Sequence, residues 1–214
     1  MRLLWDALKG AASDIAAESY LFIVYNLLWV VMSLLIIPLP FATGGLFFAA
    51  REVSARRAVG WRTFFAGGRQ VARPMYVWGA LNLGVALILF TNISFYGRLG
   101  NVFGDVIQSV LISAALVWLL LQLFVVPVLL QLKQPSLRLA LQDSSFLMLR
   151  HPLTSVAMAL VVSVLIVAST MIPVLLAGIT PAAIAVLSTR VVGEELARHR
   201  DEEPDGRRLE SKRK

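Results

Sequence analysis

The chain contains no cysteine, so neither disulfide bonds nor thiolate chemistry can contribute to its fold or function. Histidine is almost as scarce, because only His151 and His199 occur and neither has a partner at the spacing of a metal-ligand set. No serine lies in a nucleophile elbow, and no glycine-rich loop that would cradle phosphates precedes a helix. The sequence therefore predicts a protein that is not an enzyme and that uses no cofactor or metal.

Charged residues are also few, at 15% of the 214 residues, whereas a soluble domain has about 25%. Four long stretches contain no charged residue at all: Ser19–Ala50, Pro74–Gly97, Val106–Leu132 and Pro152–Thr189. A membrane-spanning helix needs about 20 apolar residues. The first stretch fits one span and a short return helix, the second and third fit one span each, and the fourth fits a pair. We therefore expect an all-α, polytopic membrane bundle of six segments.

The distribution of polar residues divides the chain into three parts. Residues 1–18 are expected to form an interfacial amphipathic helix. Residues 19–197 are the expected transmembrane domain, whose connections include two cytoplasmic amphipathic helices, at 52–73 with a break at Gly67-Gly68 and at 136–150. Residues 198–214 carry many charges of both signs, which is typical of a disordered cytoplasmic tail.

The net charge of +7 predicts the orientation of the chain in the membrane. Basic residues concentrate at 51–73, at 133–150 and in the tail, and the positive-inside rule places such segments in the cytoplasm. We expect a bacterial inner (plasma) membrane protein with both termini in the cytoplasm; a five-segment arrangement would place the N-terminus outside. The same rule explains the basic residues without nucleic acid as a partner.

Six arginines in the first basic segment are candidates for binding anionic headgroups of the inner leaflet, where each basic residue contributes about 1 kcal/mol. These residues are Arg51, Arg56, Arg57, Arg62, Arg69 and Arg73. In the second basic segment, Arg138, Asp143 and Arg150 lie on a helix that superficially resembles the coupling loop of ABC importer permeases. That helix either docks on a partner or simply lies at the membrane surface.

Six polar residues within or beside the apolar stretches are candidates for the interior of the bundle, because an amide or hydroxyl group in lipid lacks hydrogen-bond partners. They are Asn26, Ser33, Asn82, Asn92, Gln108 and Gln122. Two interpretations remain open for them. They form hydrogen bonds between helices, at about 0.6 kcal/mol each, or they line a weakly polar pathway.

Several short motifs, taken in order, resemble the YesL family of bacterial integral membrane proteins over about residues 15–195. The motifs are Asn26-Leu27-Leu28-Trp29, Ser33-Leu34, Pro38 and Pro40, Ala42-Thr43-Gly44, Arg51-Glu52-Val53, Asn92-Ile93-Ser94-Phe95-Tyr96, Ser144-Ser145-Phe146 and Arg150-His151-Pro152. The Pro-Leu-Pro step departs from the usual leucine-proline-hydrophobic pattern of that family. The family has no assigned function, so the resemblance implies no catalytic residues.

Three hypotheses about function follow. Some members of the family resemble accessory components of sugar-uptake ABC transport systems, which suggests a non-enzymatic accessory role with transporter permease subunits as partners. The polar residues of the spans suggest a small channel or facilitator. The arginines suggest a scaffold or sensor that binds anionic membrane lipids.

Overall fold

The computed structural model describes residues 2–171 and 179–202 of the chain. Within these residues the protein is all helical, with nine helices and no strand. The helices are α1 (Arg2–Ala17), α2 (Ser19–Ser33), α3 (Leu39–Ser54), α4 (Trp61–Gln70), α5 (Ala72–Gly97), α6 (Val102–Gln131), α7 (Leu137–Arg150), α8 (Pro152–Met171) and α10 (Thr180–Glu202). The external turn expected at Pro173 lies outside the described residues.

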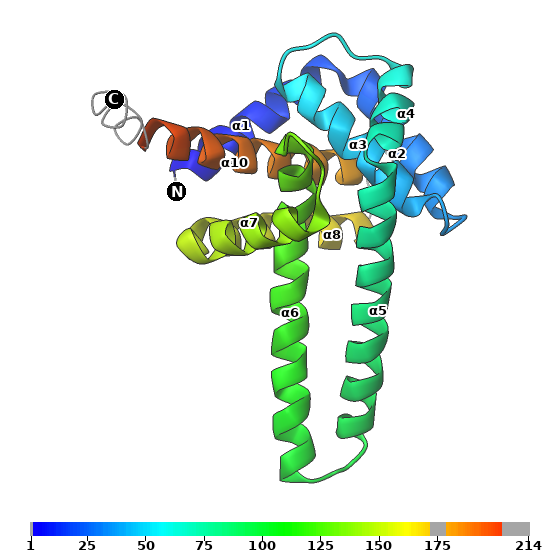
Figure 1. Ribbon diagram of the computed structural model, residues 1–214, viewed down its shortest axis with the longest axis vertical. Helices are drawn as coiled ribbons and strands as arrows, with labels where there is room; N and C mark the ends of the chain where they lie inside the picture. The colour runs from blue at the N-terminus through cyan, green and yellow to red at the C-terminus, as the bar shows by residue number, and fades with distance from the viewer. Residues whose placement is uncertain (1, 172–178, 203–214) are drawn as a thin grey trace, which may run out of the picture.

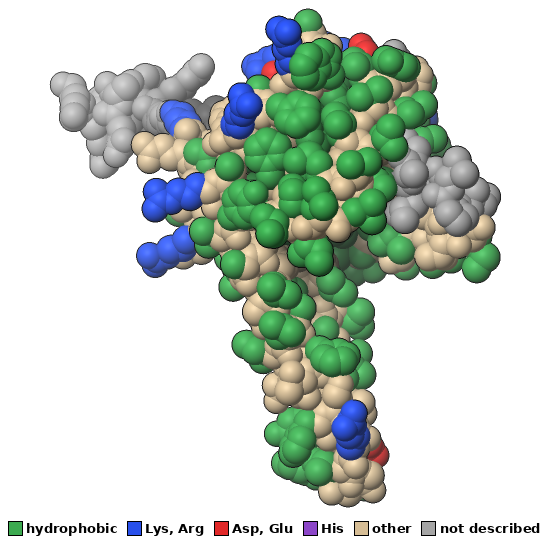
Figure 2. Space-filling view, turned by 90° about the vertical axis from the view of Figure 1, so that its right-hand side faces the viewer, with side chains coloured by type: hydrophobic (Ala, Val, Ile, Leu, Met, Phe, Trp, Pro, Cys, Tyr) green, Lys and Arg blue, Asp and Glu red, His purple; other side chains and the backbone are tan. Residues whose placement is uncertain are grey.

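The helices form a body from which one long hairpin projects (Figure 1). The hairpin consists of α5 and α6, which pack along each other and are joined by a short loop at the far end. In the body, α3 packs against α2, α4, α5 and α10, and α10 also packs against α1 and α6. Figure 2 shows hydrophobic side chains over much of one face of both the body and the hairpin.

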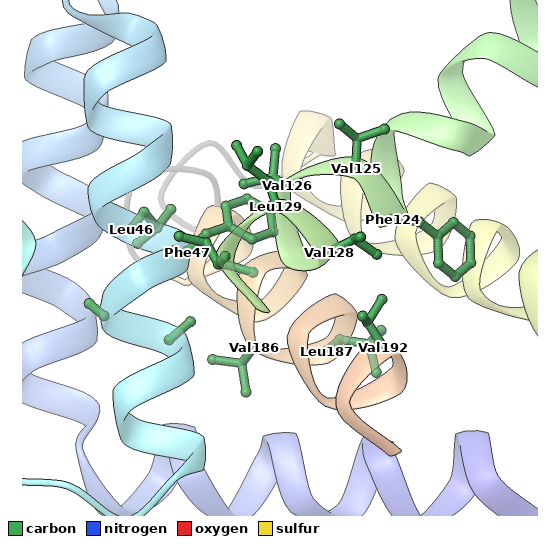
Figure 3. Close-up of a cluster of buried hydrophobic side chains, with 14 of the residues drawn as sticks. Leu46, Phe47, Phe124, Val125, Val126, Val128, Leu129, Val186, Leu187 and Val192 are labelled. Carbon is green, nitrogen blue, oxygen red and sulfur yellow. The ribbon is translucent and has the colours of Figure 1, made fainter. Parts of the chain in front are cut away.

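The main core lies where α3, the last turns of α6, and α10 meet (Figure 3). Leu46 of α3, Leu129 of α6 and Val186 of α10 are among its buried side chains. The last two turns of α6 are buried, whereas the first half of that helix exposes most of its apolar side chains. The hairpin is therefore anchored in the body at one end only.

Three helices, α5, α6 and α8, are long and apolar enough to cross a membrane. A fourth candidate arises if the helix pair Trp5–Ala16 and Ser19–Ser33, bent by 91°, counts as one broken span. Helix α2 has 15 residues, fewer than the expected first span needs, whereas α3, with 16 residues, is short as expected of the return helix. Helix α10 is polar in its second half and continues to Glu202, so 198–202 are helical and only 203–214 of the expected tail lie outside the described residues.

The connection between α2 and α3 begins earlier than the prolines predict. Helix α2 ends at Ser33, and an exposed apolar turn over 34–37 follows it. Ile36 in this turn has φ of 57°, a left-handed conformation that a β-branched residue rarely adopts. Helix α3 then starts at Leu39, with Pro40 in its first turn, where a proline costs no backbone hydrogen bond.

The structure corrects the expected helix break at Gly67-Gly68. Both glycines lie inside α4 and are buried, and the actual break between α3 and α4 covers 55–60. Added Cβ atoms at Gly67 and Gly68 would collide with the rings of Phe48 and Phe41, both on α3. The two glycines are therefore needed for close packing of α4 on α3.

Gly45 supplies the reciprocal contact from α3. A Cβ atom there would lie 2.6 Å from the backbone carbonyl oxygen of Phe64, which cannot move as a flexible side chain can.

We expect Gly45→Ala to lower the free energy of unfolding by about 1–3 kcal/mol through overpacking. Thermal unfolding in detergent measures the change. Gly84→Ala is the matched control, because a Cβ atom at Gly84 meets nothing within 4 Å; equal effects of both substitutions would contradict the packing argument.

Candidate functional site

Two tryptophans and two amides form a hydrogen-bonded network between α5 and α6. The indole Nε1 of Trp78 donates to Oε1 of Gln122 at 2.8 Å, and Nε1 of Trp118 donates to Oδ1 of Asn82 at 3.1 Å. Asn82 Nδ2 donates to the carbonyl oxygen of Trp78 at 2.9 Å and approaches Gln122 Oε1 at 3.4 Å. Each helix contributes one amide and one indole, so the network ties the hairpin together near the body.

The sequence indicated the two amides of this network but not its tryptophans. Trp78 and Trp118 are four residues from Asn82 and Gln122 on their own helices, a spacing that places each pair on one helix face. That spacing is the signal that could have found them. The Nε2 atom of Gln122 is buried and has no hydrogen-bond partner among the described residues, so one donor of the network is unused.

Asn26 holds a different pair of helices together. It is fully buried on α2, and its Oδ1 accepts a hydrogen bond from the backbone N–H of Ala182 at 2.9 Å. Ala182 lies in the first turn of α10, where backbone N–H groups have no partner within the helix. Asn26 therefore caps α10 from another helix, 156 residues away in the sequence.

The remaining polar candidates bond to backbone carbonyl groups. Ser33 Oγ donates to Trp29 O at 2.6 Å and Asn92 Nδ2 donates to Ile88 O at 2.7 Å, each within its own helix. Gln108 on α6 approaches Ile93 O on α5 at 3.4 Å. Asn82 and Gln122 thus lie together, but the described structure does not bring all six polar candidates around one space.

The six arginines expected to bind headgroups do not lie in equivalent environments. Arg51 is directed inward and donates to Leu130 O at the end of α6 and to Glu52 at 3.0 Å. Arg57 is exposed and pairs with Glu52 at 3.0 Å. The other four are exposed: Arg56, Arg62, Arg69 and Arg73. Arg57 and these four arginines are therefore the exposed members of the set, whereas Arg51 is partly buried.

Exposed aromatic rings accompany basic groups on three helices. The ammonium group of Lys9 lies 5.1 Å from the ring centroid of Trp5 on α1, and the guanidinium group of Arg62 lies 5.2 Å from that of Trp61 on α4. On α7, the guanidinium of Arg150 lies 5.9 Å from the ring of Phe146. Aromatic and basic side chains in this combination suit the boundary between headgroups and hydrocarbon.

The expected docking helix, α7, exposes its charged residues. Arg138, Asp143 and Arg150 are exposed, whereas Ala140 and Leu147 are buried. Helix α7 packs mainly on α6, with smaller contacts to α5 and α8. A partner could reach the charged face of α7, and the same arrangement suits a helix that simply lies at a membrane surface.

Two buried carboxylates were not anticipated from the sequence. Asp14 on α1 is 1% exposed, and its Oδ2 accepts from Nε and Nη2 of Arg190 on α10 at 2.8 and 2.7 Å, and from Ser54 Oγ on α3 at 3.2 Å. Glu195 is 3% exposed and lies 3.3 Å from Nε2 of His151. Residues 176 positions apart form the first pair, so no local pattern could have indicated it.

Comparisons with known proteins and the geometry of the described residues point to no particular chemistry. Neither a family model, a curated protein nor a solved structure matches the chain. Among residues 2–171 and 179–202, no three His, Asp or Glu side chains are grouped so that they could hold a metal ion. The polar groups described above are chiefly engaged in joining helices.

The capping role of Asn26 gives a test of this arrangement. We expect Asn26→Leu to lower the free energy of unfolding by about 1–3 kcal/mol, because it leaves the buried N–H of Ala182 without a partner. Asn92→Leu is the control, since Asn92 is half-buried and its amide bonds to a carbonyl group of its own helix, α5. Unfolding in detergent measures both variants. If Asn92→Leu proves as damaging as Asn26→Leu, the capping contact is not the reason.

The ion pairs of Glu52 with Arg51 and Arg57 make the stability of the protein depend on pH. Burial raises the pKa of the Glu52 carboxyl, but hydrogen bonds and charge from Arg57 and Arg51 outweigh burial and lower this pKa below its ordinary value. A carboxyl with a lowered folded-state pKa stabilises the protein above its unfolded-state pKa of about 4.3, and this contribution disappears as the pH falls through the folded-state value.

We therefore expect Glu52→Gln to lower the unfolding temperature at pH 7, and we expect this effect to become smaller as the pH falls below about 4.3. Unfolding curves of both proteins between pH 3.5 and 7 measure the difference. Asp143→Asn is the control, because Asp143 is exposed on α7. A Glu52→Gln effect that is the same at both ends of the pH range would refute the ion-pair explanation.

Proposed function

We propose that this protein is a non-enzymatic, multi-pass membrane protein that acts as an accessory subunit of a membrane transport complex and docks through its α5–α6 hairpin. The observation that carries the proposal is the hairpin itself. It leaves the body as an isolated pair of apolar helices, each long enough to cross a membrane (Figure 1). An accessory subunit needs such a surface within the bilayer, because its partner is itself embedded there.

The free part of the hairpin exposes large apolar side chains on both helices. They include Leu83, Leu87, Ile88, Phe90 and Phe95 of α5, and Val106, Val110, Ile112, Leu116 and Leu119 of α6. Small residues lie among them: a Cβ atom at Gly84 would meet nothing within 4 Å, and Ser109 and Ser113 are exposed and bond only to carbonyl groups of their own helix. Small residues four positions apart let a second membrane helix approach closely.

A channel has less support than docking. The Asn82–Gln122 network joins α5 to α6, and Asn26 joins α2 to α10, so these amides serve contacts between helices. A pocket of about 250 Å³ lies between α2, α3, α8 and α10, but Trp29, Leu46, Phe47 and other largely apolar side chains line it, and none of the six polar candidates does. The exposed arginines are consistent with contact between this protein and anionic headgroups, whichever partner it has.

We place the protein in the bacterial plasma membrane with the basic segments 51–73 and 133–150 in the cytoplasm, as the positive-inside rule predicts. Helix α1 packs along α10, and Asp14 pairs with Arg190 across this contact, so the first and last described helices lie together. This contact supports an even number of crossings with both termini on one side. Six segments satisfy that condition if α2, α3 and α10 enter the membrane with α5, α6 and α8.

Photo-crosslinking in native membranes tests the docking surface. We expect a photoreactive amino acid at Ile88, exposed on the hairpin, to give adducts with another membrane protein. The control position is Leu149, which is exposed on α7 in the body. Identification of a permease subunit in the Ile88 adducts would support the transport role. Lipid adducts alone at Ile88, in cells that express the protein at native levels, would refute docking through the hairpin.

A further inference from the structure

A pocket of about 310 Å³ lies at the junction of α3, the end of α6, and α10, apart from the hairpin surface. Its lining residues are Arg51, Ser54, Ala55, Gln131, Thr189, Arg190, Gly193 and Glu194. The pocket thus contains two guanidinium groups that come from different helices. Of its lining residues, the sequence indicated only Arg51 as a candidate for binding headgroups, and the proposed docking role does not account for the pocket.

Both guanidinium groups are fixed by hydrogen bonds to residues that do not line the pocket. Arg190 donates from Nε and Nη2 to Asp14, which is buried, and Arg51 donates from Nη1 to Leu130 O and from Nη2 to Glu52. A guanidinium group has five N–H groups, and these contacts use two on each arginine. The other N–H groups have no acceptor among the described residues, so each arginine is pre-oriented and still has donors to offer.

The guanidinium group of Arg190 packs closely against α1 at Gly10. A Cβ atom at Gly10 would lie 2.6 Å from Cζ of Arg190, so the guanidinium group rests directly on the backbone of α1. A side chain at this position of α1 would compete with Arg190 for its place beside Asp14. The orientation of Arg190 is therefore set by α1 as well as by its own helix.

Thr189 is a second polar residue of α10 that lines the pocket. It is 5% exposed and lines the pocket, and its Oγ1 is buried without a hydrogen-bond partner among the described residues. Ser188, its neighbour on α10, bonds to Ile184 O at 2.6 Å, as a helical hydroxyl group ordinarily does. A buried hydroxyl group that makes no such bond is an unsatisfied hydrogen-bonding group.

We propose that this pocket binds a phosphate group, presented either by a lipid headgroup or by free inorganic phosphate. Guanidinium groups recognise phosphate oxygens through paired N–H donors, and two of them from different helices suit an anion with several oxygens. Asp14 and Glu52 offset the charges of the two arginines, and Glu194 adds a third carboxylate, so two positive groups face three negative ones. Recognition therefore depends on directed hydrogen bonds and not on net charge.

Gly193 permits a test that leaves the arginines and their ion pairs unchanged. It lines the pocket, and a Cβ atom there would meet nothing within 4 Å. Gly193→Leu therefore fills the pocket, and it also replaces a helical glycine by a better helix former. Gly84→Leu is the matched control, because Gly84 is a helical glycine in equally open space on α5. Thr189→Val removes the hydroxyl group at nearly constant volume.

The experiment measures the shift in unfolding temperature that phosphate causes in the full-length chain, using tryptophan fluorescence. In one arm the protein is in detergent and inorganic phosphate replaces chloride at constant ionic strength. In the other arm it is in nanodiscs of phosphatidylcholine alone or with phosphatidylglycerol. We expect a saturable stabilisation of the wild type in one of the two arms, with apparent Kd at least tenfold weaker in Gly193→Leu, about three- to tenfold weaker in Thr189→Val, and unchanged in Gly84→Leu.

The two arms separate the sources of the phosphate group. Saturation with inorganic phosphate identifies a soluble ligand, whereas a response to phosphatidylglycerol alone identifies a headgroup. The proposal is overturned if neither arm stabilises the wild type, or if Gly193→Leu responds as the wild type does, since that result indicates general screening of surface arginines. Either result leaves docking through the hairpin untouched, because Gly193 and Thr189 are not on α5 or α6.

Discussion

A polar group surrounded by apolar side chains must find its hydrogen-bond partner within the protein, and the contacts among these helices follow from that requirement. Asn26 meets it by capping α10, and the amides of Asn82 and Gln122 meet it by bonding to indoles across the hairpin. Each of these bonds joins helices that their apolar faces alone would leave free to slide. The polar residues therefore determine register, while apolar burial supplies most of the attraction.

Helix α10 makes several of the contacts that hold the helices together. Asn26 holds its first turn, Val186 and Leu187 bury its middle in the main core, and Arg190 joins it to α1 (Figure 3). The same helix supplies Thr189, Arg190 and Gly193 to the pocket beside α3. Structure and the proposed phosphate site thus share one element, so the arginines of the pocket are positioned by contacts that also maintain the fold.

This use of polar residues bears on function. Because the amides of Asn26, Asn82 and Gln122 are occupied in joining helices, contacts with other molecules are left to exposed residues, among them those of the hairpin and the arginines of the body. The first surface suits a partner within the bilayer, and the second suits headgroups and anions. An accessory role requires both, since such a protein must be retained in the membrane and engage another protein there.

The helical class and the apolar helices α5, α6 and α8 could be predicted from the sequence, which also indicated Asn26, Asn82 and Gln122 as polar residues among apolar ones. These features depend on composition and on local periodicity. Only the tertiary structure decided which helices those residues join, because the partners of Asn26 and Asp14 lie 156 and 176 residues away.

The expected break at Gly67-Gly68 illustrates the same limit. A pair of glycines weakens an isolated helix, and local reasoning accordingly ended a helix there. In the folded protein, close packing of α4 on Phe41 and Phe48 of α3 excludes any side chain at these positions and keeps the glycines helical. Local propensity therefore decided which segments are helices, and long-range packing decided where one helix ends and which of its faces another helix covers.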